Sequence, residues 1–348
     1  MYNIKNILFI FFSLCFLLVL SCEDKNSNTN PIDEIDYSKA PKGFPPIPFP
    51  KDNQYSPTKE KLGRYLFFEK ILSRDSTYSC ANCHNPRYAF ANNVPNPITI
   101  NKFPLPRNVL SLVNVGYRKS LNWDGVEITL EEAIYHDFTS PLFFDNDTNE
   151  IFQRLSSHPF YPKMFEAAFG KGSKPYPYLA AKAIATFVRT LVSGTSSYDK
   201  FINGDSSALT EKQKLGMRLF FSERTRCSEC HSGFLFTDLK YHNTGTTNHY
   251  FDFGRYYITG DYKDRSKLKT PSLRNVEITA PYIHDGTYQT LEKVIENYNR
   301  GGFPFFNKDT TIKPLNLTNY EKEALLEFLK SLTDWDFLNQ PRFKTFGY

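Results

Sequence analysis

The sequence predicts a helical protein made of two similar domains. Apolar residues recur at helical spacing in most segments that have a clear period. The stretch 61–68 returns as 214–221, with the shared pattern Lys-Leu-Gly-x-x-Leu-Phe-Phe. A repeat of this kind indicates a duplicated structural unit. At 348 residues the chain is long enough for two units with cores of their own.

The predicted boundary between the domains is the Gly- and Ser-rich segment 193–207. It separates an N-terminal domain, 58–195, from a C-terminal domain, 208–340. The segment 85–122 has many Pro and Asn residues and no clear period, so we expect a long irregular loop there. The charged segment 261–273 is expected to be exposed. Periodicity and end signals predict helices that begin near residue 58 and then cover 129–135, 149–155, 163–169, 178–191, 290–298 and 318–332.

The first 22 residues are typical of an export signal, with a lysine followed by an apolar run. The end of this run resembles a bacterial lipoprotein cleavage site, so Cys22 would become the lipidated first residue and Cys15 would be discarded. An ordinary secretory signal or an uncleaved anchor helix are the alternatives. Residues 23–57 are rich in Pro and Asn and are expected to form a tether. We therefore expect a periplasmic or cell-envelope lipoprotein whose only membrane attachment is the lipid at Cys22.

The same five-residue pattern, C-x-x-C-H, occurs as Cys80 to His84 and again as Cys227 to His231. In this pattern two thiols bond covalently to the vinyl groups of a haem, and the histidine ligates its iron. One structural zinc held by four cysteines, or two short disulfides, are the alternatives. Neither explains the histidine after each pair. The predicted cofactors are two covalently bound c-type haems, attached through Cys80, Cys83, His84, Cys227, Cys230 and His231.

Composition agrees with such cofactors. The chain has 32 Phe and 22 Tyr residues, which suit the apolar walls of a site for large flat groups. Its formal charge of +5 comes from scattered basic residues and not from a run, so we expect no nucleic-acid partner.

Several further motifs, in order, resemble the bacterial di-haem cytochrome c peroxidases and their MauG-type relatives. The resemblance implies an all-α pair of cytochrome c-like haem domains with long irregular loops. It also implies that hydrogen peroxide reacts at the N-terminal haem, with electrons passed through the C-terminal haem. Besides the two haem motifs, the matching stretches are 62–68, 106–108, 123–125, 271–276, 279–286 and 298–302.

The resemblance also implies roles for single residues. Trp123 matches the family's tryptophan between the haems, where an indole can relay electrons; a place in the core is the alternative. Asn108, Thr279 and Pro281 match a calcium site, and hard oxygen donors are the ligands that Ca²⁺ requires. We therefore expect one calcium ion.

The axial ligands follow from counting along the sequence. The main peroxidase branch supplies a histidine from the loop after the first motif, but 85–122 contains neither histidine nor methionine. We therefore expect an open distal side at the His84 iron, as in MauG-type proteins. The position of the second haem's methionine holds Tyr298, which suggests a tyrosine ligand. A tyrosine that only packs at a helix end is the alternative.

Splitting the O–O bond of peroxide requires a group that moves a proton between its oxygens. The family's glutamate and glutamine positions hold Phe143 and Ala133, which cannot do so. Asp145 is the favoured substitute, with His136 and Asp137 as further candidates, and exposed loop residues without a role are the alternative. Three further histidines, His158, His242 and His249, are expected to be structural or at the haem edge.

The expected function is peroxide reduction by an exported di-haem oxidoreductase, with electrons from a small periplasmic redox protein. A second hypothesis is oxidation of a partner protein, as in MauG-type enzymes, through the Tyr298 haem. A third is an electron-transfer or sensing cytochrome without peroxide chemistry, which Phe143 and Ala133 suggest.

Overall fold

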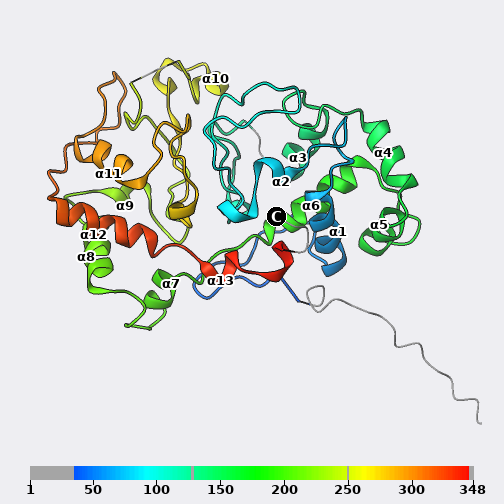
Figure 1. Cartoon of the computed structure of the whole chain (residues 1–348), viewed down its shortest axis with the longest axis horizontal. Coiled ribbons are helices and arrows are strands. Elements are labelled where there is room, and N and C mark those ends of the chain that lie inside the picture. Colours follow the sequence, from blue (N-terminus) through cyan, green and yellow to red (C-terminus); the bar gives the residue numbers. More distant parts are fainter. Residues whose placement is uncertain (1–34, 127–128, 249–250, 345–348) are drawn as a thin grey trace, which may run out of the picture.

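The computed structural model describes residues 35–126, 129–248 and 251–344, which form two helical lobes side by side (Figure 1). The first lobe contains α1 (Pro57–Phe68), α2 (Cys80–Cys83), η2 (Pro86–Tyr88), η3 (Val115–Tyr117), α3 (Leu130–Thr139), α4 (Thr148–Ser157), α5 (Tyr161–Phe169) and α6 (Pro177–Arg189). The segment between α2 and α3 is irregular except for the two short 3₁₀ helices, as predicted.

The second lobe is also mainly helical. Its elements are α8 (Glu211–Phe220), α9 (Cys227–Cys230), β1 (Tyr241–His242), α10 (Tyr256–Thr259), η4 (Tyr262–Asp264), β2 (Leu268–Lys269), η5 (Val276–Ile278), α11 (Leu291–Asn299) and α12 (Asn319–Lys330). The two short strands pair antiparallel. The predicted capping box at Thr318 is present, and Leu325, Phe328, Leu329 and Leu332 are buried.

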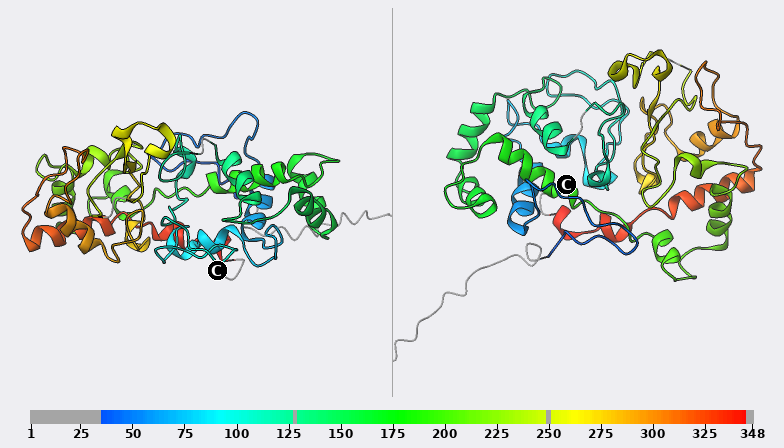
Figure 2. Two further views of the ribbon diagram at one scale, coloured as in Figure 1. Left: turned by 90° about the horizontal axis from the view of Figure 1, so that it is seen from above. Right: turned by 180° about the vertical axis from the view of Figure 1, so that it is seen from behind.

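Each lobe has its own hydrophobic cluster. The first is built around α1, α3, α5 and α6, and the second around α8, α11 and α12. The chain then returns to the first lobe with α13 (Trp335–Leu338) and η6 (Pro341–Phe343), which Figure 2 shows from two further sides. Phe337 and Phe343 belong to the first cluster, and Phe337 lies within 208–340, the range that the sequence assigned to the second domain. The predicted linker likewise contains a helix, α7 (Ser197–Ile202).

The described part of the predicted tether packs on both lobes. The ring of Phe44 lies 4.7 Å from that of Phe234 and 6.2 Å from that of Tyr117. Asn53 is 1% exposed and donates to Glu131 Oε1 at 2.6 Å. Contacts with residues far along the chain therefore fix a segment whose composition alone indicates an extended chain.

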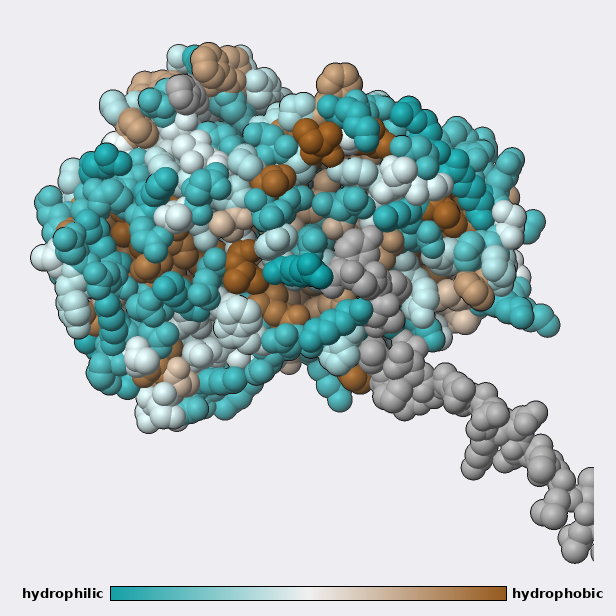
Figure 3. All heavy atoms as spheres, viewed as in Figure 1, coloured by the Kyte–Doolittle hydropathy of each residue, from teal (hydrophilic) through white to brown (hydrophobic). Residues whose placement is uncertain are grey.

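The predicted signal and lipid attachment, with Cys15 and Cys22, lie outside the described residues. Within 35–126, 129–248 and 251–344, no helix combines the length and the apolar character needed to cross a membrane. On the face shown in Figure 3, hydrophobic residues gather near the junction of the lobes, and most of the other surface is hydrophilic.

The repeated glycine explains why 61–68 and 214–221 resemble each other. A β-carbon at Gly63 would overlap the carbonyl oxygen of Ala183 in α6, and one at Gly216 would overlap that of Ala324 in α12. Each lobe therefore contains a helix pair, α1 with α6 or α8 with α12, that only a glycine allows to approach so closely. The two lobes share this crossing as a structural unit.

Substitution of Gly216 tests the importance of this crossing. We expect Gly216→Ala to lower the free energy of unfolding by about 1–3 kcal/mol, because the added methyl group must push α12 away. Gln153→Ala, on the exposed face of α4, is the control and should change it by no more than about 0.5 kcal/mol. Denaturant titration of both variants measures this, and equal stabilities would show that the helices move apart at no cost.

Candidate functional site

The two C-x-x-C-H motifs have the same local geometry. Each cysteine pair spans a short helix, α2 or α9, and the histidine caps its C-terminal end. The N–H of His84 donates to Cys80 O at 2.8 Å, and the N–H of His231 donates to Cys227 O at 2.9 Å. All four cysteines have free thiols, and α2 and α9 lie in different lobes (Figure 1). One zinc ion shared by the four thiols therefore does not fit this arrangement.

Both histidines are prepared to bind a metal. Nδ1 of His84 lies 3.0 Å from Phe90 O, and Nδ1 of His231 lies 3.1 Å from Phe236 O. Because a carbonyl can only accept, each Nδ1 carries the proton, and Nε2 keeps the lone pair that an iron needs. Burial lowers the pKa of His84 to about 4 and also lowers that of His231, so both rings are neutral at neutral pH. The side chains therefore fit haem iron.

The sequence did not reveal the two phenylalanines that orient these rings. Phe90 and Phe236 both have a positive φ, 57° and 54°, which bulky residues rarely adopt. Their side chains are buried in the two lobe cores. The only available signal was an aromatic residue five or six positions after each histidine.

A cavity in the second lobe, called the second cavity below, reaches from the α9 motif to the junction with the first lobe. Cys227, Cys230 and His231 line it at one side, and Trp123 lines it at the other. Its walls are largely apolar, with contributions from Leu291, Ile295, Leu325 and Leu329. Such walls suit a haem, whose flat ring is apolar.

Tyr298 lines this same cavity at the C-terminal end of α11. Burial raises the pKa of its phenol to about 12, although a hydrogen bond with the Thr244 side chain acts in the opposite direction. The phenol is thus neutral unless a metal displaces its proton. The predicted ligand and His231 border one cavity, as a pair of axial ligands requires.

The predicted calcium residues meet at the junction of the lobes. The Asn108 amide donates to Pro281 O and, at 3.4 Å, to Ile283 O, while Asn108 Oδ1 is buried without a hydrogen-bond partner among the described residues. Thr279 lines the same cavity as these residues. A buried oxygen without a donor, beside backbone carbonyls, is a donor set that fits Ca²⁺.

Trp123 is held at this junction from both lobes. Its Nε1 donates to Asn108 O at 2.8 Å, and its carbonyl accepts from the Lys269 N–H at 2.8 Å. Its ring makes an edge contact with that of His284, with centroids 6.3 Å apart. Trp123 is partly exposed and borders the second cavity.

The motif residues beside Trp123 connect the lobes. Arg107 binds Asp252 of the second lobe through Nε at 2.6 Å and Nη2 at 2.8 Å, and binds Asp124 through Nη1 at 2.5 Å. Burial opposes the charge of Arg107, but the two carboxylates raise its pKa overall. Arg107 and Asp124 lie in stretches that match the family. The sequence did not indicate that they form one ionic cluster with Asp252.

The candidates for proton transfer differ in their surroundings. Phe143 and Ala133 pack against the first core, as does Cys80. Asp145 is bound by Arg74 and accepts from Asn101 Nδ2 at 3.0 Å, and His136 is exposed on α3.

Asp137, also on α3, differs from these candidates. Burial raises the pKa of the Cys80 and Cys83 thiols, and the charge of Asp137 raises both further. Among the candidate carboxyls, Asp137 is therefore the one whose charge acts on both thiols of the first haem motif.

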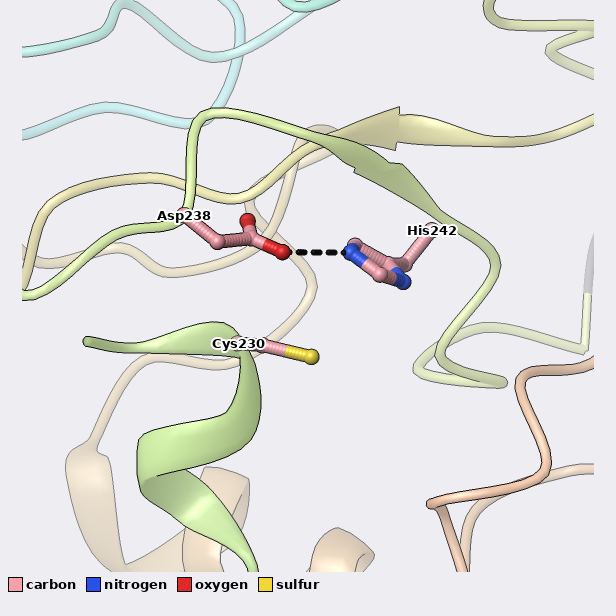
Figure 4. A group of neighbouring side chains, drawn as sticks. All are labelled: Cys230, Asp238 and His242. Atoms are coloured by element: carbon pink, nitrogen blue, oxygen red, sulfur yellow. Dashed lines mark hydrogen bonds and ion pairs between the residues drawn. The ribbon is translucent and has the colours of Figure 1, made fainter.

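His242 borders the second cavity, as expected of a haem-edge residue. Figure 4 shows its ring facing Asp238, which lies 2.9 Å from Nε2, with Cys230 nearby. Asp309 lies 2.6 Å from Nδ1. The group of Cys230, Asp238 and His242 could hold a metal ion, but the same thiol is needed for haem attachment.

His158 is not among the residues that line this cavity. His158 packs on Tyr161, with ring centroids 4.7 Å apart. His249 lies outside the described residues.

Two helical lobes, each with a C-x-x-C-H helix and a buried neutral histidine, define a di-haem c-type cytochrome. Residues 57–207 match the family model described as "Di-haem cytochrome c peroxidase". The methylamine utilization protein MauG of Methylorubrum extorquens is 33% identical over 287 residues, which cover 82% of this chain and 81% of MauG. The cytochrome-c peroxidase IdrP1 of Pseudomonas sp. is 33% identical over 322 residues, which cover 83% of this chain and 84% of IdrP1.

The solved structures agree. A MauG-like protein associated with microbial copper homeostasis is 34% identical, with a TM-score of 0.83, and the match covers 87% of this chain and 97% of that one. The chain belongs to the di-haem cytochrome c peroxidase and MauG family.

Proposed function

We propose that the protein is an exported oxidoreductase that reduces hydrogen peroxide at the haem held by His84. Electrons would come from a small periplasmic redox protein through the second haem. The observation that supports this most directly is the asymmetry of the two sites. Tyr298 borders the second cavity, whereas the loop after His84 offers neither histidine nor methionine to close the first site. A site without a second protein ligand leaves room for peroxide.

The chain's own groups would bind and orient the cofactors. When bound, haem supplies the exchange of electrons with peroxide. Cys80 and Cys83 would attach the first haem, and the Phe90 carbonyl keeps the His84 ring in its ligating tautomer. Trp123, fixed by contacts from both lobes, would conduct electrons between the sites.

A second candidate function is oxidation of a partner protein, with peroxide as the oxidant. Tyr298 favours it, because an anionic phenolate stabilises higher oxidation states of iron than a methionine does. Two similar proteins are named for MauG, one of them linked to methylamine utilization and the other to copper homeostasis.

Two spectroscopic measurements on the ferric holoprotein test the proposal. We expect electron paramagnetic resonance to show one high-spin and one low-spin iron, because only the second site has two protein ligands. We also expect stopped-flow absorbance to show a rapid oxidation of the haems after peroxide is added. A fast return of the ferric spectrum when a small electron donor is present supports peroxide reduction. A long-lived spectrum of the oxidised haems supports oxidation of a partner protein. Two low-spin signals without any reaction would leave only an electron-transfer cytochrome.

We also propose that Asp137 moves the proton during peroxide cleavage. It lies on α3, the helix that also carries Ala133, and its charge raises the pKa of the Cys80 and Cys83 thiols. A carboxyl group is a suitable proton carrier, whereas Phe143 is not. Asp145 is already bound by Arg74 and Asn101.

Separate substitution of Asp137 and of Asp145 distinguishes these two candidates. We expect Asp137→Asn to slow the stopped-flow reaction with peroxide by about 10²–10⁴-fold, the usual contribution of a general acid–base group. Asp137→Glu should restore part of the rate, and Asp145→Asn is the matched control that should leave it nearly unchanged. Equal rates for wild type and Asp137→Asn would exclude the role, and a slow Asp145→Asn variant would transfer it to that residue.

We also propose a calcium ion at Asn108, because Asn108 Oδ1 is buried without a hydrogen-bond partner among the described residues. Chelation by EGTA should lower the melting temperature of the wild-type holoprotein, because an ion bound only to the folded state stabilises it. Asn108→Ala should have this lower value with or without EGTA, since its backbone bonds to Trp123 and His284 remain possible. Asn93→Ala, at an exposed asparagine, should keep the calcium response. An unchanged response in Asn108→Ala would show that the ion binds elsewhere.

A further inference from the structure

In the part of the chain that the structure describes, one buried cation has no carboxylate partner. Five Lys or Arg residues among the described residues are buried, and four of them, Arg64, Arg189, Arg274 and Arg342, pair with a carboxylate within 4.0 Å. Lys269 is 3% exposed and has no such partner within the described parts of the chain. This finding corrects the expectation that the segment 261–273 is exposed throughout.

The Nζ hydrogen bonds of Lys269 go to carbonyl groups of the first lobe, and this atom also lies 5.9 Å from the centroid of the Tyr241 ring. Its Nζ donates to Leu121 O at 3.1 Å and to Ser120 O. Arg118, from the first lobe, is in a similar situation, because its Nη2 donates to Ser111 O at 3.2 Å. Both side chains line the second cavity, together with His231 and Tyr298.

The two cations are unfavourable neighbours as they stand. Burial and, next in size, the charge of Arg118 lower the pKa of Lys269 to about 7. Burial also lowers the pKa of Arg118 to about 10. A buried cation beside a half-buried one is costly unless an anion compensates the two charges. Asp124 raises the pKa of Lys269, but by less than burial and Arg118 lower it.

We propose that Arg118 and Lys269 bind the propionate carboxylates of the second haem. A haem attached at Cys227 and Cys230 must occupy this cavity, and its two propionates are its only anionic groups. A planar guanidinium and an ammonium group are the donors that carboxylates prefer. Arg274 lines the same cavity but is already paired with Asp199 through both of its terminal nitrogens.

This site would join the lobes through the cofactor. Arg118 belongs to the first lobe and Lys269 to the second, and the Lys269 N–H also donates to Trp123 O at 2.8 Å. The propionates would therefore hold both sides of the junction beside the proposed relay. The inference rests on the attachment of a second haem, on which the proposed function also depends, but it does not require peroxide chemistry.

The test uses the holoprotein, with a haem count by absorbance for each variant. In Lys269→Met we expect the propionate bending mode in resonance Raman spectra to shift to lower frequency, because a hydrogen bond to a propionate is lost. The reduction potential of the second haem should also fall, since a buried positive charge favours the reduced state. A tenfold change in this equilibrium corresponds to about 59 mV for one electron. Arg118→Met should act in the same directions, and Lys269→Arg should restore both values.

Two other lysines provide the controls. Lys267 lies two positions away on the same segment, pairs with Asp264 and does not line the cavity, so Lys267→Met should change neither readout. Lys313 is exposed at the cavity wall and is the rival cation. A Raman shift in Lys313→Met instead of Lys269→Met would overturn the proposal. So would a lower potential with an unchanged Raman mode, which shows a charge effect without contact.

If Lys269→Met fails to fold, Arg118→Met decides by the same two readouts. A normal haem count with no shift in Arg118→Met overturns the propionate site and leaves the proposed function intact. A wild-type protein with fewer than two haems would instead remove the basis of both.

Discussion

The structure depends on the contacts that fix segment 107–124 between the two lobes. Asn108 accepts from the Trp123 indole through its carbonyl and donates to His284 O, at 2.6 Å, through its N–H. Arg107 connects Asp124 of the first lobe with Asp252 of the second. Breaking a largely buried ion pair of this kind typically costs about 3–5 kcal/mol, because the remaining charges stay unpaired. The orientation of Trp123 and the distance between the two sites therefore depend on the same few bonds.

The duplication preserved what each site needs to bind haem. In both lobes a glycine allows a close helix crossing, and a buried phenylalanine directs its carbonyl to the histidine. A bulky residue with positive φ costs on the order of 1–3 kcal/mol and persists only where the surroundings enforce it. That cost occurs twice, at Phe90 and Phe236. The tautomer of the ligating histidine is thus a property of the fold and not only of the five-residue motif.

Local signals in the sequence predicted the attachment motifs, most helices and the irregular loop, because these depend on residues close together in the chain. The packing of 41–53 on both lobes and the burial of Lys269 depend on residues about 70 or more positions away, and no local pattern contains that information. The choice between the candidate proton carriers depends on such distant contacts as well. Asp145 and Asp137 are equally polar in sequence, but only the fold binds Asp145 to Arg74 and places the charge of Asp137 near the haem thiols.

The charges around the second cavity account for how a tyrosine could serve as an iron ligand there. The phenol of Tyr298 has a pKa of about 12 because it is buried, so its deprotonation needs compensation by positive charge. A ferric iron supplies part of it, but two propionates add negative charge to the same cavity. In the proposed arrangement Arg118 and Lys269 neutralise the propionates, which leaves the charge of the iron available to the phenolate. The cations at the lobe junction and the ligand at the end of α11 would then act as one electrostatic system, and the potential of the second haem would depend on how closely the lobes are joined.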